Sequence, residues 1–246
     1  MSFFSGYRFF VTLILLLIPA VILGLCEKRL SWYRWVLSLF FIWKVYGDTP
    51  VQLYYLIGYV VFATYLVKIH LFLRTKYEKN KYIYAHAVFL ALLPLIIYKL
   101  SALKGNSLFG FLGISYICFR VIQVIIESYD GVIKEISEIR FVEFLIFFPS
   151  LSSGPIDRSR RFFEDDARIW TRQEYCDLLW IGFYKIVLGA FYKIVCSACF
   201  YNLLQTYFVG RYKPLYILGY AYVYGMYLFF DFAGYSAMAV GTSYLL

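Results

Sequence analysis

Three groups of polar residues interrupt this strongly apolar chain, and each could line a reaction site. The segment GISYICFRVIQVIIESY (113–129) carries Arg120, Gln123 and Glu127 at positions i, i+3 and i+7. This spacing places the three side chains on one face of a helix. A charge inside a membrane span is costly and by default marks a functional site. We therefore take Arg120 and Gln123 as candidate residues of a substrate path. The alternative is that Arg120 and Glu127 only satisfy neighbouring helices.

The second group lies in FFPSLSSGPIDRSRRF (147–162), where Pro149, Gly154 and Pro155 break any helix. The apolar run 139–151 before it is too short to cross a bilayer comfortably. Together they predict a helix that enters the membrane, breaks and returns to the cytosol; an ordinary cytosolic loop is the alternative. The candidate path residues here are Ser152, Ser153 and Asp157, followed by the cations Arg158, Arg160 and Arg161.

The third group is in LFFDFAGYSAMAVG (228–241), where Asp231 follows two phenylalanines. Gly234 and Gly241 allow another helix to approach closely. A carboxyl group in such a segment must be paired, protonated or hydrated, and Arg120 is a candidate partner for Asp231. The candidate site residues of this segment are Asp231, Tyr235 and Ser236.

The usual catalytic side chains are scarce. His70 and His86 are the two histidines, and both positions favour an interfacial or packing role over that of a general base. Cys196 and Cys199 have the C-x-x-C spacing, but they lie in an apolar helix without a second ligand pair. We interpret them as packing residues and predict no metal site.

The composition indicates that the chain lies in a membrane. Of its 246 residues 62% are hydrophobic and only 16% are charged, whereas soluble domains are about 45–50% apolar and about 25% charged. The sequence predicts an all-α, polytopic membrane protein that forms a single membrane domain over residues 1–246. The expected spans lie near residues 8–25, 32–47, 51–72, 82–99, 107–127, 179–205 and 213–232, and residues 234–246 are expected to begin a further helix.

The distribution of cations predicts the orientation. Short loops rich in Lys and Arg stay in the cytosol, and such loops follow the first and third expected spans, whereas the turn at 47–50 has little positive charge. We expect a multi-pass membrane protein with an extracellular N-terminus, and cytosolic residues 73–82, 128–140 and 157–173. The net charge of +9 is explained by this orientation and by anionic lipid headgroups. No separate basic domain is present to bind nucleic acid.

Three motifs carry a resemblance to a known family. LGISYICFR (112–120), FFPSLSSGPIDRSRRF (147–162) and DFAGYSAMAVG (231–241), in this order, resemble motifs of the membrane-bound O-acyltransferase family. The whole chain resembles those members of the family that transfer D-alanine in Gram-positive bacteria.

The resemblance implies a ring of membrane helices around a thin centre that is pierced by a funnel, with segment 147–162 as a re-entrant part of its wall. It implies that D-alanine passes from the phosphopantetheine thioester of an acidic D-alanyl carrier protein in the cytosol to a hydroxyl of lipoteichoic acid or another extracellular acceptor. Ser152, Ser153 and Asp157 would lie near the cytosolic entrance, and Arg158, Arg160 and Arg161 would contact the carrier. The chain itself would bind no cofactor, since the carrier delivers the phosphopantetheine-linked D-alanine.

In this family a histidine beyond the DFAGYS motif is the general base, and neither His70 nor His86 matches its position. No catalytic residue is therefore assigned, and we expect the chain to be the N-terminal part of an acyltransferase, without transferase activity alone. Two alternatives are a transporter or flippase, since broken helices and charges at the midplane also mark translocation sites, and a non-catalytic membrane scaffold for a carrier protein.

Overall fold

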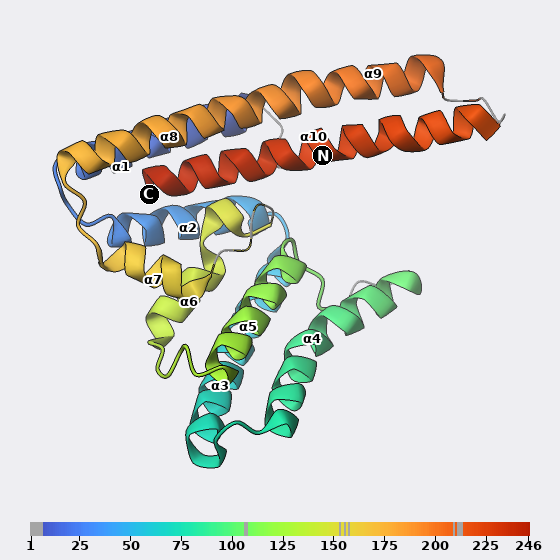
Figure 1. The fold of residues 1–246 in the computed structure, drawn as a ribbon. Coiled ribbons are helices and arrows are strands. Elements are labelled where there is room, and N and C mark those ends of the chain that lie inside the picture. The colour runs from blue at the N-terminus through green and yellow to red at the C-terminus, as the bar shows by residue number, and fades with distance from the viewer. Residues whose placement is uncertain are drawn as a thin grey trace. The chain divides into compact units, whose positions relative to one another are not determined.

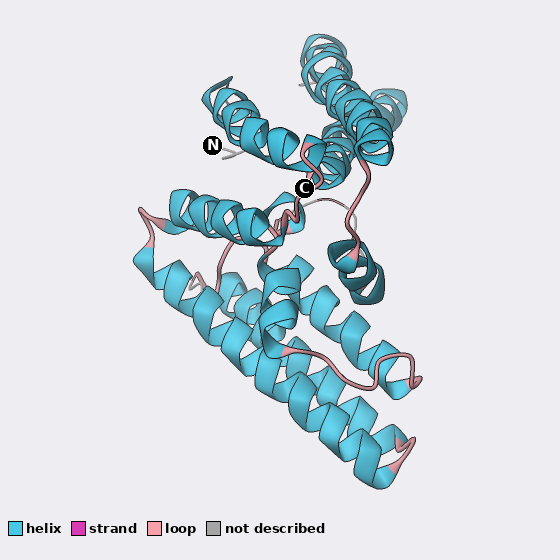
Figure 2. Cartoon of the chain, turned by 90° about the vertical axis from the view of Figure 1, so that its left-hand side faces the viewer, coloured by secondary structure: helices cyan, strands magenta, loops and turns pink. Residues whose placement is uncertain are grey.

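The predicted fold class is confirmed. The computed structural model describes residues 7–105, 108–152, 154, 156, 158–208, 210 and 214–246, with the side chains of residues 7–10 excepted. Within these ranges the chain consists of helices joined by short loops, without a strand (Figure 2). The helices are α1 (Tyr7–Leu25), α2 (Ser31–Tyr46), α3 (Pro50–Tyr77), α4 (Lys81–Leu103), α5 (Ile114–Tyr129), α6 (Glu138–Ile146), the 3-10 turn η1 (Phe148–Ser150), α7 (Ser159–Ala167), α8 (Arg172–Phe191), the π-helical turn η2 (Tyr192–Cys196), α9 (Ser197–Tyr207) and α10 (Pro214–Leu245).

Among the described residues, three helices are long and apolar enough to cross a membrane. They are α3, α4 and the continuous helical run from Arg172 to Tyr207 that α8, η2 and α9 form together. The membrane character of the chain is thereby supported. The number of spans and the side of the N-terminus stay predictions.

The C-terminal part of the chain corrects one expectation. We expected one span to end near residue 232 and a further helix to begin at 234, but α10 runs without a break from Pro214 to Leu245. No proline follows Pro214 in this helix, and Gly234 packs against another helix instead of ending its own.

The chain divides into two compact units. The first consists of Met1–Ile18, Lys28–Ser152 and Ile156–Ile169, and the second of Pro19–Glu27, Ser153–Pro155 and Trp170–Leu246. The prediction of one membrane domain over residues 1–246 stays a prediction.

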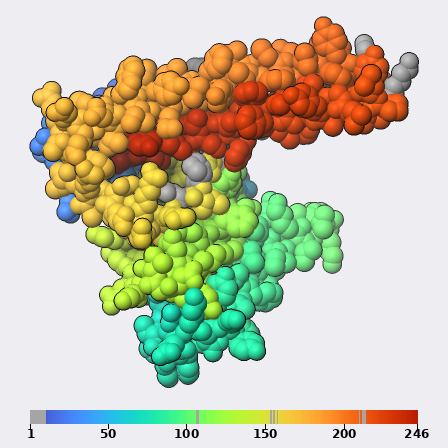
Figure 3. Space-filling model, viewed as in Figure 1, coloured from blue at the N-terminus to red at the C-terminus, as the bar shows by residue number. Residues whose placement is uncertain are grey.

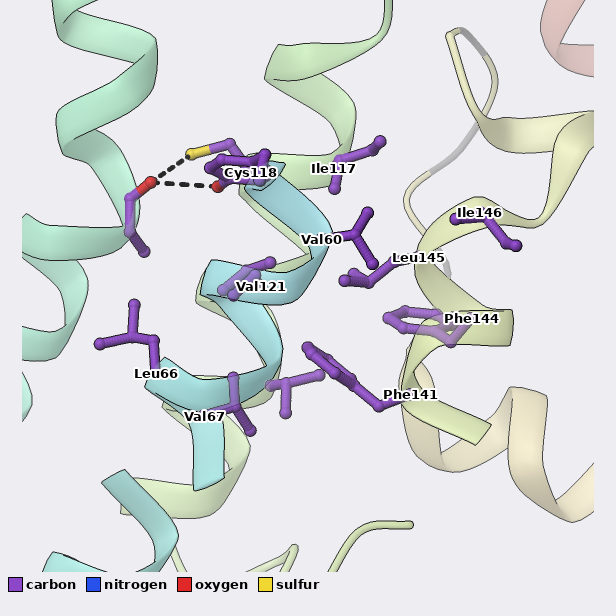
Figure 4. Close-up of a cluster of buried hydrophobic side chains, with 14 of the residues drawn as sticks. Val60, Leu66, Val67, Ile117, Cys118, Val121, Phe141, Phe144, Leu145 and Ile146 are labelled. Carbon is purple, nitrogen blue, oxygen red and sulfur yellow. Dashed lines mark hydrogen bonds between the residues drawn. The ribbon is translucent and has the colours of Figure 1, made fainter. Parts of the chain in front are cut away.

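The core of the first unit lies where α3, α4, α5 and α6 pack together. Figure 4 shows Val60 and Val67 of α3 and Val121 of α5 beside Phe141 and Phe144 of α6, all of them buried. Two of these helices begin at residues that favour a helix N-terminus. Pro50 is the first residue of α3, and the Asn80 side chain accepts hydrogen bonds from backbone N–H groups in the first turn of α4. The core therefore fixes α5 against α6, the helix that precedes the break.

In the second unit, the α8–η2–α9 run and α10 lie side by side in antiparallel directions (Figures 1 and 3). Glycines allow their backbones to touch. A Cβ atom on Gly234 would lie 2.7 Å from the Gly189 carbonyl oxygen, and one on Gly241 would lie 2.5 Å from the Gly182 carbonyl oxygen. Gly182 pairs with Gly241 and Gly189 with Gly234 because each helix repeats its glycine after seven residues. The predicted close approach at Gly234 and Gly241 is confirmed.

Candidate functional site

Arg120 holds the point where α6 breaks. Its side chain is buried, at 1% exposed, and Nη1 donates to the carbonyl oxygens of Phe144 at 2.7 Å and Leu145 at 3.1 Å. Nη2 donates to the carbonyl oxygen of Ser150 in η1. The last carbonyl groups of a helix have no partner within the helix, and an arginine offers five donors in a rigid fork. Arg120 thus satisfies backbone groups that the break at Pro149 leaves free.

The start of α5 touches the same broken segment. Gly113 has φ +86°, and a Cβ atom there would lie 2.3 Å from the Leu151 carbonyl oxygen. Only glycine combines this left-handed backbone with so close an approach. Gly113 therefore lets the loop before α5 approach the residues that follow η1.

Two further residues of α5 hold the beginning of α7. The backbone N–H of Ser159 donates to Gln123 Oε1 at 3.3 Å, and the Ser159 hydroxyl donates to Glu127 Oε2 at 3.2 Å. The first N–H groups of a helix need such partners. Arg120, Gln123 and Glu127 share one face of α5, as their spacing predicts. That face binds both ends of the segment between α6 and α7.

The broken segment itself contains several of the predicted site residues. Ser150 is buried and Ser152 is half-buried, whereas Ser153 and Asp157 lie outside the described residues. The helix break is confirmed by the end of α6 at Ile146, by η1 and by the non-helical residues before α7. Its depth in the membrane and the roles of the serines stay predictions.

The predicted carrier-contact arginines lie at and near the start of α7. Arg160 pairs with Glu164 at 3.3 Å, and Arg161 pairs with Asp165 at 3.7 Å. All four side chains are exposed, and Arg158 is exposed at the N-cap. The outer face of α7 therefore carries both signs of charge, and Phe162 and Phe163 on its inner face contact Phe144.

A buried charged cluster in the first unit is absent from the sequence-based candidates. Arg34 of α2 donates through Nη2 and Nε to Glu143 Oε1 of α6, at 2.9 and 3.1 Å. It also donates to Asp166 Oδ1 of α7, which accepts a further hydrogen bond from Ser31 Oγ. In the sequence Arg34 counts only as one of the cations that orient the chain. The signal that was available is Glu143, alone in the apolar run FVEFLIFF, since a buried carboxylate requires a partner.

Burial and the neighbouring charges shift the pKa of Glu143 in opposite directions. Burial raises the pKa of the Glu143 carboxyl, the Arg34 guanidinium lowers it, and the nearby Asp166 carboxylate raises it further. Burial is the largest of these influences and leaves the pKa above its usual value. One cation therefore serves two carboxyl groups and joins α2, α6 and α7 at a single point.

In the second unit Asp231 is paired with Lys193, a residue that the sequence does not single out. Lys193 Nζ donates to Asp231 Oδ1 at 2.5 Å and lies 3.7 Å from the centroid of the Tyr235 ring. The candidate partner Arg120 is instead engaged with α6 and η1 within its own unit. The contact between Gly189 and Gly234 brings the helix of Lys193 against α10 and so places this cation beside Asp231.

The helix geometry at Lys193 is unusual. Residues Tyr192–Cys196 form a π-helical turn between α8 and α9. Such turns are rare and often occur at functional sites. Ser236 follows Tyr235 on α10, and its hydroxyl oxygen is buried without a hydrogen-bond partner among the described residues. The polar cluster of the second unit thus consists of Lys193, Asp231 and Tyr235 at a local distortion of the helix.

The two histidines have local partners. His70 is buried, and its Nδ1 lies 3.3 Å from the Ser128 hydroxyl of α5. His86 is exposed, and its Nδ1 lies 2.8 Å from the Tyr82 carbonyl oxygen one turn earlier in α4. These contacts agree with a packing role for His70. Neither histidine has a hydrogen bond to Arg120, Arg34 or Lys193 among the described residues.

A helical chain with membrane-length apolar helices and charged side chains enclosed among them is typical of an integral membrane protein with a polar interior. Over its whole length the chain is similar to the teichoic acid D-alanyltransferase of Bacillus subtilis strain 168, with 36% identity in an alignment of 261 positions that covers 100% of this chain and 65% of that protein. It is 36% identical to the protein of the same name from Lacticaseibacillus rhamnosus (99% of this chain, 64% of that protein). It is 37% identical to that of Streptococcus thermophilus (97% and 59%).

The chain spans slightly less than two thirds of the length of these relatives, between 59% and 65%. No family model matches it. The resemblance that the three motifs predict is confirmed: along its whole length the chain is similar to proteins named teichoic acid D-alanyltransferase.

Proposed function

We propose that this chain acts in the D-alanylation of teichoic acid, as part of a membrane O-acyltransferase. The observation that carries the proposal is its similarity, along its whole length, to proteins named teichoic acid D-alanyltransferase. In the proposed reaction a hydroxyl of teichoic acid attacks the carbonyl carbon of a D-alanyl thioester. The C–S bond breaks, an ester C–O bond forms, and the hydroxyl proton ends on the released thiol.

The experiment that tests this function measures D-alanyl esters on teichoic acid, released by mild base, in cells without the gene and in cells that carry it again. We expect the esters to be lost and then restored. An unchanged ester content without the gene would overturn the proposal. Binding of the carrier protein without any contribution to ester formation would favour the scaffold alternative.

The proposed donor is D-alanine on the phosphopantetheine of an acidic carrier protein, and α7 is the proposed docking helix. Arg160 and Arg161 support this because they are exposed and because their i,i+4 ion pairs contribute only about 0.3–0.5 kcal/mol each. An acidic partner can therefore take these cations from Glu164 and Asp165 at little cost. Charge attraction of this kind is screened by salt.

Two opposite sets of substitutions on α7 test the docking. Replacing Arg158, Arg160 and Arg161 by alanine should weaken carrier binding, most strongly at low salt. Replacing Glu164 by Gln and Asp165 by Asn removes competing anions from the same face and should strengthen it. Equal carrier binding by both variants and the unmodified protein, measured by titration at two salt concentrations, would exclude α7 as the docking surface.

We also propose a multi-pass arrangement with the N-terminus outside and the loop between α3 and α4 in the cytosol. Support comes from contacts within the first unit: Lys79 pairs with Asp130 at 3.2 Å, and Arg74 Nε donates to the Tyr129 carbonyl oxygen. Both cation-rich loops, 73–82 and 128–140, therefore lie at the same end of this unit. Cysteine placed at Lys79 should react with a membrane-impermeant thiol reagent only after the cells are opened. Reaction in intact cells would show that this loop lies outside and would contradict the proposed orientation.

A further inference from the structure

The side chains of Asp231 and Tyr235 both contact the ammonium group of Lys193. The Lys193 ammonium donates to the Asp231 carboxylate at 2.5 Å and lies 3.7 Å from the centroid of the Tyr235 ring. A carboxylate beside an aromatic ring is a combination that recognises organic cations, because the ring face is electronegative. Asp231 and Tyr235 are one turn apart on α10 and so lie on the same face of that helix.

The two partners of the ion pair differ in exposure. The Lys193 side chain is 11% exposed, whereas the Asp231 side chain is 35% exposed. The carboxylate is therefore the more accessible partner of the ion pair. Lysine is also suited to leave, since its ammonium is a point charge on a flexible stem and makes no bidentate contact with the carboxylate.

We propose that Asp231 and Tyr235 bind the ammonium group of an aminoacyl substrate, and that Lys193 is an internal competitor that occupies this site until the substrate displaces it. A free α-amino group has a pKa of about 7.7–8.0. The amino group of an alanyl ester is therefore largely protonated at pH 7. The identification of the aminoacyl group as D-alanyl rests on the proposed function. The site itself rests on the three side chains.

The site makes Asp231 a specificity-determining residue. It distinguishes an alanyl group from an acyl group of the same size without nitrogen, since only the former can replace the lysine ammonium at the carboxylate. The π-helical turn Tyr192–Cys196 contains Lys193, and it places the lysine opposite Asp231 at a point where the backbone departs from regular α-helical hydrogen bonding.

The experiment titrates the purified protein in detergent with D-alanine methyl ester and, as the matched neutral probe, with methyl propionate, by ligand-observed nuclear magnetic resonance. Removing the competitor in Lys193→Gln should tighten binding of D-alanine methyl ester by about twofold or more. The gain is one plus the ratio of the lysine's effective concentration to its own dissociation constant, and this ratio is at least about one when the lysine occupies the site. Adding Asp231→Asn to that variant should abolish the gain. Methyl propionate should bind all variants equally. Lys185→Gln, on α8 two turns earlier, is the control and should leave both titrations unchanged.

Unchanged binding of D-alanine methyl ester by Lys193→Gln, or an undiminished gain after Asp231→Asn, would overturn the inference. Lys193→Arg keeps the charge of the pair and thereby protects the fold. It should weaken binding of the ester, because a guanidinium holds a carboxylate at two points. Tighter binding by this variant would also overturn the inference. The ester content of teichoic acid separates the two proposals. Ammonium binding without any role in ester formation contradicts the proposed function alone, whereas ester formation with no ammonium site contradicts this inference alone.

Discussion

Arg120 in the first unit and Lys193 in the second are both cations in apolar helices, but they are neutralised by different kinds of group. Arg120 donates to three backbone carbonyl oxygens of α6 and η1, which cannot move without unfolding that segment. Lys193 donates to the side chain of Asp231, which is 35% exposed and can accept another partner. The first arrangement serves the fold, and the second is open to exchange with a ligand.

The largest effect on stability is expected from Arg120→Met. The substitution leaves the carbonyl oxygens of Phe144, Leu145 and Ser150 without this donor, and each buried acceptor without a partner costs about 1–3 kcal/mol. The free energy of unfolding should fall by about 3 kcal/mol or more, measured by thermal unfolding of the purified protein in detergent. Arg140→Met, at an exposed position of α6, is the matched control. Equal melting temperatures of the two variants would show that Arg120 does not hold the break.

The helix break illustrates how far the sequence predicts the first unit. Pro149 and the apolar run before it predict the end of α6, and the spacing of Arg120, Gln123 and Glu127 predicts their common face. The partners of Arg120 were not predictable, because a backbone carbonyl group leaves no mark in the sequence. Arg34 shows the same difficulty for long-range pairs, since Glu143 is 109 residues away and Asp166 is 132 residues away.

The second unit was predictable in composition but not in detail. The glycines at 234 and 241 indicate close helix packing, yet their partners Gly182 and Gly189 become meaningful only once the antiparallel register of α8 and α10 is known. Lys193 lies in the run FYKIVCSACF, where the C-x-x-C spacing is the more conspicuous pattern. A π-helical turn has no recognised signature in such a run.

Substitutions at two glycines of α10 test whether Gly234 brings this helix against the one that carries Lys193. Gly234→Ala places a methyl group 2.7 Å from the Gly189 carbonyl oxygen, and overpacking of this kind costs about 1–3 kcal/mol. A methyl group at Gly225 would meet no atom within 4 Å, so Gly225→Ala should stabilise the helix by up to about 1 kcal/mol. Thermal unfolding should therefore shift in opposite directions. A shift of both variants in the same direction would show that Gly234 does not bring the two helices together.

A smaller effect is expected where α5 holds α7. Ser159→Ala removes the hydroxyl that donates to Glu127 Oε2 but keeps the backbone N–H that donates to Gln123. The loss of one hydrogen bond to a carboxylate should lower the free energy of unfolding by about 1.5–3 kcal/mol if the bond is fully buried, and by about 1 kcal/mol in this partly buried place. Glu127→Gln retains an acceptor and should cost less. Thermal unfolding of both variants checks the order, and a larger loss for Glu127→Gln would contradict it.

The smallest loss of stability is expected from Lys193→Met, and this variant decides whether the two cations differ in kind. The Asp231 side chain is 35% exposed and is not fully enclosed by protein when its partner is removed, and partly exposed ion pairs contribute about 1 kcal/mol or less. The melting temperature should therefore fall much less than in Arg120→Met, although both substitutions remove a cation from an apolar helix. If Lys193→Met unfolds the protein as readily as Arg120→Met, Asp231 depends on the lysine for its burial. The pair would then be a structural contact like that of Arg120, and a ligand could not displace it.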